Sequence, residues 1–184
     1  YMSYESLAVM PEFEKMIGQG AVLVDVGGGS MQITLFQEGR AVTTQHIELG
    51  IMRIWEKLSQ IRNMVSHYET QIQELIDKEL EIFKRLYLEE KDIKYVILMG
   101  DYIGEMVMDF SKKQEDGTIE AERFLKILNK WHKKTAKEIA TELNLVNEND
   151  PLILPSVVLY KRLTEEMNAE NVWVPNVSVG DGIV

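Results

Sequence analysis

The sequence has no cysteine among its 184 residues. Disulfides, thiolate metal sites and cysteine nucleophiles are therefore excluded from the chemistry of these residues. Its apolar runs are short, and none approaches the roughly 20 residues that a membrane-spanning helix needs, so we expect no membrane protein. The first stretch, YMSYESLAVM, lacks a basic region followed by an apolar core and shows no secretory signal. Together these absences favour a cytoplasmic location.

Positive charge is also scarce. Lys and Arg number 20 against 30 Asp and Glu, which gives a formal net charge of −10. Because contacts to nucleic-acid phosphates need clustered Lys and Arg, this balance argues against a nucleic-acid-binding protein. Any anionic ligand must then be held by backbone amides, by a metal ion or by another domain. The remaining composition, 45% hydrophobic and 27% charged, is typical of a globular domain.

Hydrophobic periodicity predicts an α/β domain. A continuous apolar run predicts a strand at 21–26 that is buried on both faces, and alternating residues predict strands at 31–37 and 41–49. A long amphipathic helix is predicted from Met64 to Leu86, followed by a buried strand at 94–99. The other predicted elements are helices at 5–17, 102–110, 119–130, 134–143 and 156–167 and a strand at 171–179. This order indicates a mixed sheet covered by helices.

Three consecutive glycines, Gly27 to Gly29, stand between the first two predicted strands, and Ser30 follows them. Since they precede a strand and not a helix, they match neither the dinucleotide fingerprint nor the Walker loop. Glycine amides without Cβ atoms around them can point into one concavity and hold phosphate oxygens. The alternative is a glycine-rich bulge in which Asp25 caps the turn amides. Spacing alone leaves both interpretations open.

Asp25 comes at the end of the first predicted strand, two residues before the glycines. A buried carboxylate without a partner is costly, so we expect one for Asp25. Magnesium is the natural partner, because it binds through one or two carboxylates together with substrate phosphates. The sequence therefore predicts a Mg²⁺ ligand beside a phosphate-binding loop.

The stretch LVDVGGGSMQITLF, residues 23–36, resembles the phosphate loop of the Ppx/GppA family, the exopolyphosphatases and guanosine pentaphosphate phosphohydrolases. The family pattern is D-I-G-G-G-S-T-E followed by an apolar strand. Other segments resemble the family in the same order: YESLAV, HIELGIMRI, YVILMGDYIGEM and the stretch from Leu152 to the end. The resemblance covers residues 5–184 and corresponds to the second domain of the family.

This resemblance implies a ribonuclease H-like fold of the actin-like ATPase superfamily, with helices on both faces of a mixed sheet. It implies that residues 1–184 form a single domain, the C-terminal half of a two-domain core whose preceding domain is absent from this chain. In the full-length protein it implies hydrolysis of terminal phosphoanhydride bonds of polyphosphate or of a guanosine polyphosphate. The choice among these substrates and ATP stays open, as does the oligomeric state, with a homodimer as one option.

The resemblance also assigns roles to residues. Glu5 stands at the position of the family's catalytic glutamate, which orients or deprotonates the attacking water. Asp25 would hold Mg²⁺. The implied phosphate-binding residues are Gly27, Gly28, Gly29, Ser30 and Gly100.

Three departures from the family pattern fall on this site. The glutamate after S-T becomes Gln32, G-G-T becomes Met99-Gly100-Asp101, and the final R-E-G becomes Gly180-Asp181-Gly182. Each change makes the cleft poorer at binding and turning over a polyanion, and we expect the isolated chain to be inactive. They leave two alternatives to a hydrolase: a catalytically drifted nucleotide or phosphate sensor, and a structural domain that contributes only an interface.

Overall fold

A computed structural model of the protein describes residues 2–61, 68–108, 113–147 and 150–175. Its centre is a six-stranded sheet with the strand order β3-β2-β1-β4-β6-β5. The strands are β1 (Ala21–Val26), β2 (Met31–Gln37), β3 (Arg40–Ile47), β4 (Tyr95–Gly100), β5 (Ile119–Glu120) and β6 (Asn171–Trp173). β1 is antiparallel to β2 but parallel to β4, so the sheet is mixed, as predicted.

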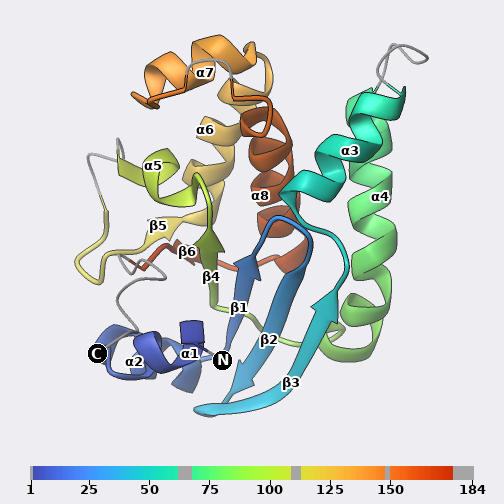
Figure 1. Cartoon of the computed structure of the whole chain (residues 1–184). Helices are drawn as coiled ribbons and strands as arrows, with labels where there is room; N and C mark the ends of the chain where they lie inside the picture. The colour runs from blue at the N-terminus through green and yellow to red at the C-terminus, as the bar shows by residue number, and fades with distance from the viewer. Residues whose placement is uncertain (1, 62–67, 109–112, 148–149, 176–184) are drawn as a thin grey trace.

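Helices cover both faces of this sheet (Figure 1). They are α1 (Met2–Ala8), α2 (Pro11–Gly18), α3 (Ile51–Ile61), α4 (Tyr68–Phe83) with its π-helical extension η1 (Lys84–Leu88), α5 (Ile103–Met108), α6 (Ala121–His132), α7 (Ala136–Glu142) and α8 (Ile153–Met167). Figure 1 shows α1 and α2 together at the lower left, apart from α3, α4 and α8.

The side chains of β1 alternate between two cores. Val22 and Val24 belong to the larger core, which also contains the apolar faces of α3, α4, α6 and α8. Leu23 belongs to the smaller core together with Phe13 of α2 and Phe36 of β2, whose rings meet edge to face at 5.6 Å. Because successive side chains of a strand point to opposite faces, this division confirms that β1 is buried on both sides.

The glycine loop joins two antiparallel neighbours. β1 and β2 pair from Ala21 opposite Phe36 to Val26 opposite Met31, and no helix begins at Ser30. This geometry confirms the predicted hairpin and excludes a dinucleotide-binding or Walker loop, since both of those open a helix.

The prediction of one helix over residues 5–17 was wrong, because two helices occupy this segment. The chain breaks before Pro11, which stands in the first turn of α2. Proline disfavours helical angles in the residue before it, and Met10 is extended, with φ −93° and ψ 120°. The break gives α1 and α2 separate axes on the same face of the sheet.

Two other predicted elements were partly wrong. The helix predicted at 119–130 starts only at Ala121, since Ile119 and Glu120 form β5 and pair with β6. The helix predicted at 156–167 begins earlier, at Ile153, which places Pro155 in its first turn.

The long helix is present as α4 and η1, and its residues Ile72, Ile76 and Leu80 pack into the larger core. Its predicted start at Met64, and the end of the last strand at 176–179, lie outside the described residues.

Candidate functional site

The candidate site begins with the glycine loop at the end of β1. The amide of Gly27 donates a hydrogen bond to the carbonyl of Ser30 at 2.9 Å, which closes the turn. Gly27 therefore uses its own amide within the hairpin. The amides of Gly28, Gly29 and Ser30 donate no hydrogen bond to a main-chain carbonyl of the described residues. These three are the amides of the loop best placed to receive an anion.

The start of α3 holds the loop from one side. The amide of Ile51 donates to the carbonyl of Gly27 at 3.1 Å, and the amide of Met52 donates to the carbonyl of Gly28 at 2.9 Å. The first amides of a helix have no partner inside the helix, so the loop carbonyls satisfy them. The glycine turn is thus a defined structure, tied to a helix that follows it by more than twenty residues in the chain.

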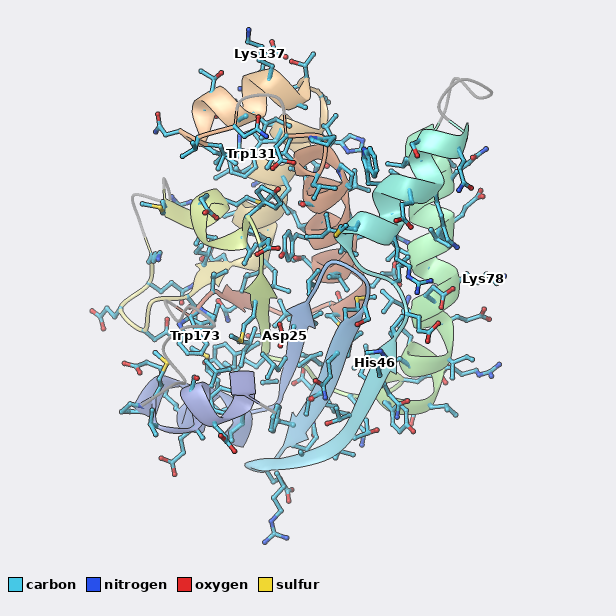
Figure 2. The ribbon with its side chains drawn as sticks, in the orientation of Figure 1. Asp25, His46, Lys78, Trp131, Lys137 and Trp173 are labelled. Carbon is cyan, nitrogen blue, oxygen red and sulfur yellow. The ribbon has the colours of Figure 1, made fainter. Side chains whose placement is uncertain are left out.

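Asp25 and Gln32 are neighbours across the first two strands. The register pairs Asp25 with Gln32 of β2 on one side and with Met99 of β4 on the other. Asp25 comes two residues after Leu23 in β1, so the side chains of both lie on the face of the sheet that α1 and α2 cover. It is half-buried, and Figure 2 labels it beside β1 and β4. The structure therefore brings the predicted metal ligand next to the residue that departs from the family pattern.

A second loop meets the glycine loop at the end of β4. Val26, the last residue of β1, pairs with Gly100, the last residue of β4. The φ of Gly100 is +136°, and a Cβ there would lie 2.4 Å from the carbonyl oxygen of Val26 and 2.7 Å from the hydroxyl of Tyr160. Only glycine fits this position. Gly100 and the exposed Asp101 after it thus stand beside the end of β1, where the glycine loop begins.

Tyr160 of α8 supports this second loop, a role that the sequence analysis missed. Its side chain is fully buried, and its hydroxyl donates a hydrogen bond to the carbonyl of Asp101 at 2.8 Å. Burial raises the pKa of Tyr160, and the negative charges of Asp101, Asp25 and Glu105 raise it further. The hydroxyl therefore stays protonated and remains a donor at any physiological pH. The available signal was the hydroxyl of Tyr160 at the end of the apolar run VVLY, but a tyrosine in such a run is equally typical of a core residue.

The backbone after Gly100 is held by a second tyrosine. Tyr102 adopts a left-handed conformation with φ +66°, and its hydroxyl donates to a carboxylate oxygen of Asp150. Burial raises the pKa of Tyr102, and the hydrogen bond to Asp150 adds to the shift. A non-glycine residue in this region persists only where its surroundings fix it. The turn from β4 into α5 is therefore a fixed structure.

The residues at the site fit only one way of binding a magnesium ion, in which the protein supplies a single ligand. Among the described residues, no group of three or more His, Asp or Glu side chains is placed to hold a metal ion by itself. A cage made by the protein alone is therefore not formed there. The single carboxylate of Asp25 does fit Mg²⁺ bound through one protein ligand, phosphate oxygens and water.

The other predicted site residues are less closely defined. Glu5 is an exposed residue of α1, and Leu7 of the same helix anchors α1 in the core on the face that carries Asp25. Asp181 lies outside the described residues. No described helix has the length and apolar character needed to cross a membrane.

Comparison with known proteins gives a consistent result. The model of the Ppx/GppA phosphatase family matches residues 5–184. No curated protein sequence matches the chain. Solved structures do resemble it. The type II variant of the Aquifex aeolicus Ppx/GppA phosphatase superposes with a TM-score of 0.67 at 14% identity, over 89% of this chain and 55% of that one.

Two further structures give similar values. An exopolyphosphatase-like protein superposes with a TM-score of 0.68 at 14% identity, over 90% of this chain and 57% of its own. An exopolyphosphatase from Cytophaga hutchinsonii gives 0.66 at 13% identity, over 92% and 59%. The chain thus spans somewhat more than half the length of these structures. The likeness confirms the predicted ribonuclease H-like, actin-like ATPase fold.

Proposed function

The chain belongs to the Ppx/GppA phosphatase family, and on this premise we propose that it is the phosphate-binding half of a phosphoanhydride hydrolase. The substrate would be polyphosphate or a guanosine polyphosphate, bound between this domain and a preceding one in the full-length protein. One observation carries the proposal: the glycine loop, Asp25 and Gly100 stand at the ends of two adjacent parallel strands. The partial coverage of the solved structures supports a second domain.

The chain's own residues would bind and orient the terminal phosphoryl group. The amides of Gly28, Gly29 and Ser30 would donate hydrogen bonds to its oxygens, and the Ser30 hydroxyl would add one more. Donors that are fixed before the reaction stabilise the developing charge without reorganising. A Mg²⁺ ion held by Asp25 would neutralise charge on the phosphate oxygens. Glu5 would orient or deprotonate the attacking water. A cytoplasmic location is part of the same proposal.

A sensor that binds phosphate without turnover is the second candidate, and Gln32 favours it. The register places the neutral amide of Gln32 directly opposite Asp25. A glutamate there would put a second acid beside the metal or the attacking water, and loss of one catalytic acid or base costs about 10²–10⁴ in rate. Phosphate binding survives such a change because it depends on the loop amides.

Binding tests the proposal directly. We expect inorganic triphosphate with Mg²⁺ to shift the amide resonances of Gly28, Gly29 and Ser30 at millimolar concentration. Asp25→Asn should remove the Mg²⁺-dependent part of the affinity, because the neutral amide is a much poorer magnesium ligand. Asp92→Asn is the matched control, since this exposed carboxylate precedes β4 and lies at the opposite end of the strand from Gly100. Unchanged loop amides at these concentrations would contradict the proposal.

A further inference from the structure

The loop carbonyls and the loop amides of this site point in opposite directions. The amides of Ile51 and Met52 fix the carbonyls of Gly27 and Gly28 toward the start of α3. A trans peptide is planar, with its N–H directed opposite to its C=O. The N–H groups of Gly28 and Gly29, which belong to the same two peptides, therefore face away from α3. The start of the helix thus decides where the loop presents its donors.

The same two hydrogen bonds polarise these donors. The N-terminus of an α-helix carries a partial positive charge, and α3 is 11 residues long. Hydrogen bonds that follow one another through a peptide strengthen each other. The positive end of α3 pulls electron density toward the carbonyls of Gly27 and Gly28, which makes the N–H groups on the far side stronger donors. An anion on that side is therefore stabilised by the partial positive charge of α3 without contacting the helix.

Gly50 makes this contact possible because it has no side chain. A Cβ at Gly50 would lie 2.3 Å from the carbonyl oxygen of Gly27 and 2.5 Å from that of Gly28. Both obstacles are backbone atoms, so no side-chain rotation relieves the clash. The φ of Gly50 is outside the left-handed region, so the position requires glycine for space and not for its dihedral angle. A methyl group there would push the loop off the start of α3.

We propose that Gly50 is a positioning residue for phosphate binding, and that α3 relays its N-terminal charge to the ligand through the peptides Gly27–Gly28 and Gly28–Gly29. This inference rests on the proposed function, because it concerns the affinity of the same loop. It adds a residue and a helix that contact no ligand themselves.

The test compares Gly50→Ala with Gly18→Ala. Gly18 ends α2, and a Cβ there meets no atom within 4 Å, so Gly18→Ala should bind inorganic triphosphate with Mg²⁺ as the wild type does. Gly50→Ala should bind about tenfold more weakly or worse, since two charge-assisted hydrogen bonds lose their geometry. Its Ile51 and Met52 amides should also lose protection from hydrogen exchange while the interior of α3 keeps it. A general loss of stability would not confine the change to these two amides.

A second measurement needs no variant and covers the case that Gly50→Ala does not fold. In the wild type, the amide resonances of Ile51 and Met52 should shift with the same midpoint as those of Gly28 and Gly29 when triphosphate and Mg²⁺ are added. Two results would overturn the relay and leave the proposed function intact. In the first, the wild type binds but the Ile51 and Met52 amide resonances do not shift. In the second, the wild type binds and the affinity of Gly50→Ala is within twofold of the wild-type affinity. Absence of binding by the wild type would overturn both.

Discussion

Replacing Tyr160 with phenylalanine removes one hydroxyl and keeps the ring that fills the core between α8 and the sheet. The side chain is fully buried, and the lost group is the donor to the Asp101 carbonyl at 2.8 Å. Loss of such a hydrogen bond costs about 1–2 kcal/mol of unfolding free energy. With a urea slope of about 2 kcal/mol per molar, the midpoint should fall by about 0.5–1 M. The melting temperature should fall by roughly 2–8 °C.

Urea unfolding followed by circular dichroism measures this change. Tyr87→Phe is the matched control, because Tyr87 is half-buried in η1, and its variant should stay within about 0.5 kcal/mol of the wild type. In the amide spectrum of Tyr160→Phe, the largest shifts should fall on Gly100 and Asp101. A loss of stability no larger than that of Tyr87→Phe would refute the role of the Tyr160 hydroxyl.

The pH dependence of this difference provides a second check. The pKa of Tyr160 is raised in the folded state from its ordinary value of 10.0, first by burial. When the pKa of a group is higher in the folded state, its contribution to stability is fully present below the pKa that the group has in the unfolded chain. This contribution is lost as the pH rises above that value. The gap between wild type and Tyr160→Phe should therefore be constant from pH 6 to about pH 9 and narrow above pH 10. A gap that changed near neutrality would contradict the assignment.

Gly100→Ala should destabilise the fold by about 2 kcal/mol or more in urea unfolding, because its φ is +136° and a Cβ would lie 2.4 Å from the carbonyl of Val26; an effect below about 0.5 kcal/mol would be inconsistent with this packing. The pKa of Glu142 is lowered to about 2, first by its hydrogen bond from Lys134. Its carboxylate therefore contributes stability above about pH 4.5 that is lost as pH falls toward 2, and Glu142→Gln should flatten this acid limb by about 1 kcal/mol in melts at pH 3 and pH 7. The 184-residue chain should release no phosphate from polyphosphate at a useful rate. In the full-length protein, activity that appears only with Gln32→Glu would indicate a drifted site, and robust release by the isolated chain would contradict the prediction.

Part of this structure could be predicted because it is local. The bounds of β1 and β2 agree with the prediction residue for residue, since alternation and the flanking glycines define a strand within its own segment. The hairpin between them follows from the same pattern. Pro11 was a local signal as well, which the prediction of one helix over residues 5–17 did not take into account. The sequence also marked Asp25 and the glycines as a site, through their composition and through the resemblance.

The sequence could not predict what depends on register and packing. Nothing near Ile119 reveals that it pairs with Val172, because the partner strand comes more than fifty residues later. In the same way, Arg162 of α8 binds both carboxylate oxygens of Asp77 on α4, at a sequence separation of 85 residues. Helical periodicity shows which face of each helix is polar but not which polar residues will meet.

By itself, then, the sequence determined strands β1 to β4, most of the helices and the family, because these reside in neighbouring residues. Only the tertiary structure decided what the site is made of. It set Gln32 opposite Asp25 and Gly100 beside Val26. It placed Tyr160 under the second loop. It also turned the first amides of α3 onto the loop carbonyls. The physical reason is that a hydrogen bond reaches about 3 Å whatever the distance along the chain, so only the folded backbone determines which groups come within that reach.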